Sequence, residues 1–99
     1  NLMFKLGFVS NVQLQELKRV EALVRDRFAL DAQDLILVSE LRARQEGFPE
    51  LHTQILFWEG DGTRYRCVIF LPVSQVGVED LPLAWAKGAF KDTGQSDCC

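Results

Sequence analysis

Two different spacings of hydrophobic residues divide the first 44 positions. Apolar residues first recur every three or four positions, which is the spacing of a helix with one buried side; they are Leu14, Leu17, Val20, Val24 and Phe28. Ser10 stands at the start with Gln13 three residues later, a capping-box spacing. The pattern predicts a helix that opens at Ser10 and ends near Ala29.

The sequence predicts strands on both sides of this helix. Leu2 to Val9 is crowded with apolar residues and reads as a strand. Leu35 to Arg44 is a second, with leucines at several odd positions and with Glu40 and Arg42 at even ones. Because side chains alternate across a strand, we expect the odd side to face the core. The even side would be apolar at one end and charged at the other.

The stretch from Gln54 to Leu71 predicts a β-hairpin. Two apolar, aromatic-rich runs, 51–58 and 63–71, flank the segment Glu59-Gly60-Asp61-Gly62. Asp-Gly between such runs favours a tight turn, because both residues tolerate the positive φ that primed turns need. If Asp61-Gly62 is a two-residue turn, Phe57 faces Arg66 and Ile55 faces Val68.

The remaining positions complete an α+β fold. Val78 to Lys91 reads as a short second helix, with Pro82 in its first turn. The element order is then β-α-β-β-β-α, which predicts a mostly antiparallel four-stranded sheet with helices packed on one face. We expect residues 1–91 to form a single domain, and 92–99 to be a flexible polar tail that ends in Cys-Cys.

The hairpin has large apolar side chains on both of its sides, so a second covering layer is needed. In a sheet with one solvent-exposed face, apolar and polar residues usually alternate along each strand, and in these strands they do not. An exposed apolar patch usually marks an interaction site. A homodimer through the sheet is the simplest solution, with Trp58 and Tyr65 as contact residues. The alternative is that the second helix folds back over the far face.

Composition and charge narrow the function classes. Hydrophobic residues make up 47% and charged residues 25%, with a formal net charge of −3, which argues against a general nucleic-acid or anionic-membrane binder. No apolar run reaches the roughly 18 residues of a membrane span. Three cysteines do not make a disulfide framework, so we expect a reducing, cytoplasmic setting.

Few residues suggest chemistry. Cys98 and Cys99 are adjacent thiols that could bind a soft metal or relay a disulfide, but two thiols do not complete a tetrahedral site, and no cofactor is expected. His52, the one histidine, has no nucleophile or orienting acid nearby in sequence. Glu40 and Arg42 share a strand side and could line a polar pocket, although such pairs are more often solvated salt bridges.

The arginines do not form one basic stripe. Strand geometry places Arg42 at one end of the hairpin and Arg64 and Arg66 at the other. From residue 10 to 91 the order α-β-β-β-α resembles double-stranded-RNA-binding domains in topology. Those domains carry a lysine cluster where this chain has Val78-Glu79-Asp80-Leu81-Pro82, which is acidic. No nucleic-acid partner is therefore expected.

The sequence favours a small, non-catalytic, homodimeric module that binds a protein or small ligand at its sheet. The alternatives are a thiol, metal or redox protein that uses Cys98 and Cys99, and a small enzyme with a pocket at Glu40, Arg42 and His52. No motif specifies a reaction.

Overall fold

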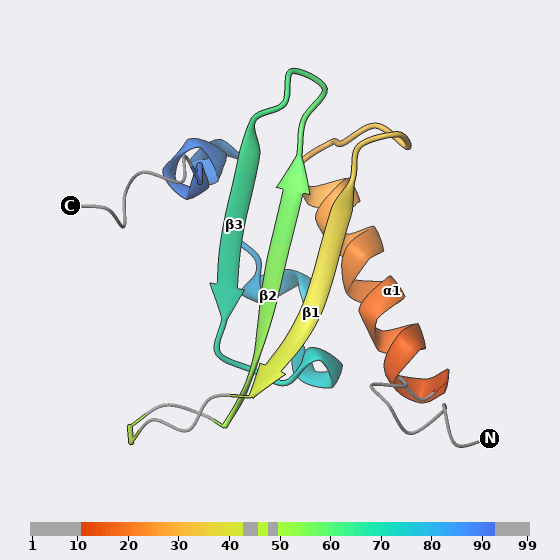
Figure 1. Cartoon of the computed structure of the whole chain (residues 1–99), viewed down its shortest axis with the longest axis vertical. Coiled ribbons are helices and arrows are strands. Elements are labelled where there is room, and N and C mark those ends of the chain that lie inside the picture. Colours follow the sequence, from red (N-terminus) through yellow and green to blue (C-terminus); the bar gives the residue numbers. More distant parts are fainter. Residues whose placement is uncertain (1–10, 43–45, 48–49, 93–99) are drawn as a thin grey trace.

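The computed structural model describes residues 11–42, 46–47 and 50–92. One α-helix, α1 (Asn11–Arg27), precedes a three-stranded antiparallel sheet of β1 (Ile36–Arg42), β2 (Leu51–Trp58) and β3 (Arg64–Ile69). The strands lie in the order β1-β2-β3, with α1 beside β1 (Figure 1). The chain is thus an α+β protein, and the first helix is confirmed. The strand expected over residues 2–9 lies outside the described residues and stays a prediction.

One layer of helices and loops covers one face of the sheet, which we call the inner face. Val20, Val24 and Phe28 of α1 are buried against the strands, and the apolar spacing in the sequence placed these three correctly. Their partners from the strands and from the segment after β3 are Ile36, Ile55, Phe57, Tyr65, Cys67, Ile69, Val73, Val76 and Leu81. Phe28, Phe57 and Tyr65 stack in series, with centroids 5.2 and 4.8 Å apart.

The hairpin register differs by one residue from the predicted one. Phe57 pairs with Tyr65 and Ile55 with Cys67, because the loop holds three residues, Gly60–Gly62, instead of two. The Gly62 amide donates to the Glu59 carbonyl at 2.8 Å, and among the loop residues only Gly62 has a positive φ, +90°. This is the turn-plus-bulge geometry of three-residue hairpin loops. The extra residue moves Tyr65 and Cys67 to the inner face.

The predicted sides of β1 are reversed. Ile36, Val38 and Glu40 face the core, whereas Leu35 and Leu37 are exposed. The charge of Glu40 made the even side look polar, but its carboxylate is satisfied internally. It accepts hydrogen bonds from the Gln13 side chain at 3.0 Å and from the backbone N–H of Val73 at 2.9 Å.

The single helix predicted for 78–91 is wrong. The segment forms two 3₁₀ helices, η3 (Val78–Asp80) and η4 (Ala84–Phe90), and a further one, η2 (Val73–Gln75), precedes it. Leu81 and Leu83, on either side of Pro82, are extended, with ψ of 148° and 150°. A residue before proline is disfavoured in helical conformation, so Pro82 separates two short helices.

Two arginines of α1 hold this segment against the sheet. Arg19 donates to the carbonyls of Val73 and Val76 at 3.1 and 2.8 Å. Arg27 donates to the carbonyls of Val78, Leu81 and Pro82 at 2.8–3.1 Å. We call these two residues the arginine clamp. The carbonyls of Val76, Leu81 and Pro82 follow the last helical turns and receive a donor from the clamp, whereas those of Val73 and Val78 also accept the amides of Val76 and Leu81 at 3.3 Å.

Candidate functional site

The face of the sheet opposite the core, the outer sheet face, is built by the alternate residues of each strand. The register sets them in four rows across the sheet. The rows are Leu35-Trp58-Arg64, Leu37-Leu56-Arg66, Ser39-Gln54-Val68 and Leu41-His52-Phe70, the last completed by a ring contact between His52 and Phe70 at 6.2 Å. Aliphatic side chains therefore follow β1 and the middle of β2, and both arginines belong to β3.

The outer sheet face leaves much of this apolar surface in water. Leu35 is 61% exposed, Leu37 49% and Phe70 53%. Leu56, Trp58 and Val68 are half-buried among them. α1, η2 and η3 pack on the inner side, and Lys87 ties η4 to Glu59 and to the buried Tyr65. Contiguous apolar surface of this kind is what partner-binding sheets present.

A hollow lies at the hairpin end of this face. Trp58, Gly62, Thr63, Arg64, Lys91 and Asp92 line it. The Arg64 guanidinium pairs with the Asp92 carboxylate at 2.9 Å, and the Asp92 amide donates to the Arg64 carbonyl at 2.8 Å. These bonds attach residue 92 to β3. Of the two cations that line the hollow, Arg64 is therefore neutralised from within the chain.

Trp58 and Tyr65, predicted to act together, lie on opposite faces. Trp58 is on the outer sheet face, where the sequence favoured it as a contact residue. Tyr65 is buried in the core, and its hydroxyl donates to Glu59 Oε1 at 2.9 Å. Lys87 of η4 pairs with the same carboxylate and lies 5.5 Å from the Tyr65 ring centroid. This group joins η4 to the sheet.

The charges in this group shift two pKa values. The hydrogen bond from Lys87 is the main cause that lowers the pKa of Glu59 below its ordinary 4.5, and the bond from Tyr65 adds to it. Burial, followed by the hydrogen bond to Glu59, raises the pKa of Tyr65. Both shifts favour the charged carboxylate and the neutral phenol. The group is therefore a stable structural contact at neutral pH.

Glu40 and Arg42 do not converge on a shared pocket. Both Glu40 oxygens accept hydrogen bonds from groups that tie α1 and η2 to β1. Arg42 is exposed and pairs with Glu50, across the antiparallel β1–β2 pair. The structure thus gives each residue a different partner.

The other candidate groups among the described residues do not come together as a reactive centre. His52 contacts Phe70 and makes no ion pair with any described carboxylate. Cys67 is a free thiol in the core, where burial raises its pKa. Cys98 and Cys99 lie outside the described residues. Within the described ranges, no three histidine, cysteine or carboxylate side chains are grouped as metal ligands would be.

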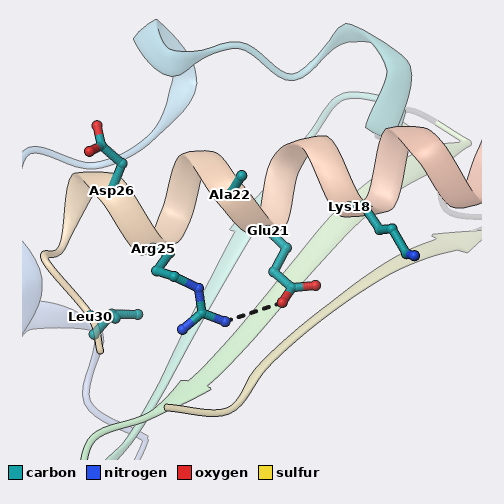
Figure 2. A pocket seen from close by; sticks show the side chains of 6 residues that line it. All are labelled: Lys18, Glu21, Ala22, Arg25, Asp26 and Leu30. Atoms are coloured by element: carbon teal, nitrogen blue, oxygen red, sulfur yellow. Dashed lines mark hydrogen bonds and ion pairs between the residues drawn. The ribbon is translucent and has the colours of Figure 1, made fainter. Parts of the chain in front are cut away.

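A second hollow lies along α1 (Figure 2) and is lined by Lys18, Glu21, Ala22, Arg25, Asp26 and Leu30. The Arg25 guanidinium turns toward Glu21 and bonds its carboxylate at 3.2 Å. It also donates to the carbonyls of Asp31 and Asp34. Two basic and two acidic residues balance one another in this hollow, so it has no excess charge for a ligand.

Sequence reasoning missed the leucines of β1 as surface residues. Leu35, Leu37 and Leu41 were assigned to the core, and they form one side of the outer sheet face. A signal was present: Ile36 and Val38 are β-branched and continue the even side, a pattern that suits a packed strand surface.

Comparisons with known proteins give no functional lead, because no family model, curated protein or solved structure matches this chain. Among the described helices, none is long and apolar enough to span a membrane. Inference about function therefore depends on the surface itself.

Proposed function

We propose that this chain is a non-catalytic interaction module that binds through the outer sheet face, and that a second copy of the chain occupies this face. The exposure of Leu35, Leu37 and Phe70 beside Leu56 and Trp58 carries the proposal. Each buried side chain of this size contributes about 1.5–3 kcal/mol relative to its exposed form. A contact that covers the face therefore gains substantial free energy.

A second copy is the simplest occupant because it brings an equal apolar surface. Most soluble homo-oligomers are closed and twofold, and a twofold contact uses the same patch on both subunits. Two outer sheet faces packed together would form a sandwich in which each sheet has one helical layer and one partner sheet. Trp58, large and half-buried at one end of the face, suits the role of an anchor.

The engagement of the polar residues supports a non-catalytic role. Glu40 and Glu59 are both held by structural hydrogen bonds, and a general base must instead reach a substrate proton. Cys67, a free buried thiol, fits a reducing compartment, and we propose a cytoplasmic location on that ground.

Light scattering at micromolar concentration tests the proposal, with an expected mass of about twice 11.3 kDa. Leu37→Lys places a charge in the middle of the face and should give a folded monomer. Val12→Lys, on α1, is the matched control because Val12 is 69% exposed and away from the sheet. A wild-type monomer, or a Leu37→Lys variant that still dimerises, would refute the proposal.

A further inference from the structure

The outer sheet face carries positive charge and supplies almost no carboxylate. Arg64 and Arg66 belong to it, and its strand positions hold no aspartate or glutamate. The carboxylate that reaches its rim, Asp92, is already paired with Arg64. This contrasts with the whole chain, whose net charge is −3.

Arg66 differs from the other described arginines. Arg19 and Arg27 bond carbonyls, Arg25 bonds carbonyls and Glu21, and Arg42 and Arg64 pair with carboxylates. Arg66 instead donates from Nε to the neutral Gln54 side chain at 3.2 Å, and it has no ion pair with a described carboxylate. Arg66 is exposed, and its guanidinium retains four N–H donors beside the one that bonds Gln54.

This charge pattern makes a second copy an imperfect occupant. Two packed outer sheet faces bring together the arginines of both chains without a carboxylate from any strand. The leucines are covered and Arg64 keeps Asp92, but Arg66 of each chain gains no carboxylate while it loses water, and leaving a charge unpaired on desolvation is costly. A partner with apolar and acidic groups satisfies both parts of the surface.

We infer that the tighter occupant of the outer sheet face is an amphipathic helix of another protein, with glutamate or aspartate beside its apolar stripe, which displaces the second copy. The inference rests on the proposed use of this face. Two strand spacings of about 4.8 Å make the face roughly as wide as one helix of about 10 Å. β3 is the edge strand, so Arg66 lies where the flank of such a helix would place a carboxylate.

The same surface suits a nucleic acid less well. Nucleic-acid platforms need several cations along the backbone and aromatic rings for the bases. Here the apolar residues in the middle rows of the face are leucine and valine, Trp58 and His52 are at opposite ends, and one of two arginines is already paired. Bidentate pairing of a guanidinium with a carboxylate is the interaction that Arg66 can best offer.

The test uses calorimetric titration of the full chain with a synthetic helix of about 15 residues, long enough to span a strand of seven residues. Its apolar stripe is leucine and its flanks are glutamate; a matched peptide has glutamine in place of glutamate. We expect the glutamate peptide to bind about tenfold more tightly than the glutamine peptide at low salt and to shift the dimer to a one-to-one complex.

Three variants locate the contact. Arg66→Ala should weaken the glutamate peptide about tenfold and leave the glutamine peptide unchanged. Arg66→Lys should recover part of the loss because it restores the charge without the planar fork. Arg42→Ala is the matched control: it removes an exposed arginine outside the outer sheet face and should not change binding.

Several results would overturn the inference. They are equal affinity for the two peptides, no binding of either, or an Arg66→Ala variant that binds like the wild type. Binding of single-stranded RNA that depends on Arg66 would assign the face to nucleic acid instead. The proposed function has a separate measurement, the oligomeric state of the Leu37→Lys variant without peptide. Its failure can therefore be distinguished from the results above.

Discussion

The two faces of the sheet have similar shares of large apolar residues and opposite surroundings. On the inner face, Ile55, Phe57 and Tyr65 are at most 4% exposed and touch α1 and the segment after β3. On the outer sheet face, Leu37 and Phe70 are about half exposed. The difference shows that hydrophobicity along a strand does not reveal which side is core. Which face becomes the core is decided by the elements that pack on it, here α1 and the segment held by the arginine clamp.

The largest effect should come from the inner face. Phe57→Ala removes a ring stacked between Phe28 and Tyr65, and large-to-small aromatic changes in a core cost about 3–5 kcal/mol of unfolding free energy. Phe70→Ala is the same change on the outer sheet face and should cost under about 1 kcal/mol. Chemical denaturation of both variants measures the contrast. Equal losses would show that the two faces are equally packed.

The arginine clamp should contribute less than the aromatic core. Arg27→Ala removes the side-chain donor to the carbonyls of Leu81 and Pro82, and hydrogen bonds to charged groups contribute about 1.5–3 kcal/mol when well shielded. Arg27 is half-buried, so we expect a loss of about 1–2 kcal/mol. Faster amide exchange confined to 73–82 would accompany it. Unchanged exchange there would argue against a clamp.

Trp58 separates a stability role from a contact role. Because it lies on the outer sheet face, Trp58→Ala should lower the unfolding free energy by about 1 kcal/mol while abolishing dimerisation. Denaturation and light scattering on this one variant give both quantities. A loss of about 3–5 kcal/mol with the dimer intact would identify Trp58 as core instead.

The Glu59 carboxylate gives the inner face a pH dependence. Its pKa is lowered in the folded chain, chiefly by Lys87. The contribution of the Glu59 charge to the unfolding free energy is therefore fully present above the ordinary pKa of 4.5 and is lost as pH falls through the folded pKa. In the Glu59→Gln variant, the decrease in unfolding free energy on acidification should be smaller by under about 1 kcal/mol, which is the contribution of a partly exposed ion pair. Denaturation curves at pH 7 and below 4.5 test it. Parallel losses in both proteins would assign the pH dependence to other carboxylates.

The smallest expected effect is on the folding of the Arg66→Ala variant. Arg66 is exposed and its hydrogen bond goes to a neutral side chain, so its removal should change stability by no more than about 0.5 kcal/mol. A thermal melt checks this. A larger loss would mean that Arg66 serves the fold rather than a partner, which would weaken the comparison between the two faces.

Local patterns predicted α1 and the three described strands well, missed the break at Pro82, and predicted the mutual placement of the elements poorly. Val20, Val24 and Phe28 fixed the helix and its buried side, and the glycines at 60 and 62 fixed the hairpin. The hairpin register depended on one extra loop residue that composition does not reveal. The orientation of β1 depended on Glu40, whose charge is satisfied by Gln13 and the Val73 amide, two groups far away in sequence.

The candidate site was only partly predictable for the same reason. An apolar, uncovered sheet face and the position of Trp58 followed from the strand composition, because too few residues remained to cover both sides. The leucines of β1 and the charge of Arg66 did not follow, since both depend on which face each strand turns outward.

The arginine clamp also affects which amino-acid substitutions residues 73–82 can tolerate during evolution. Arg19 and Arg27 donate hydrogen bonds to main-chain carbonyl oxygens, which every amino acid has. These bonds therefore do not depend on the side chains of residues 73–82. Exposed positions such as Ser74, Gln75 and Glu79 can therefore vary without loosening the segment. The core still constrains the buried Val73, Val76 and Leu81, so divergence among descendants of this sequence should concentrate at the exposed positions between them.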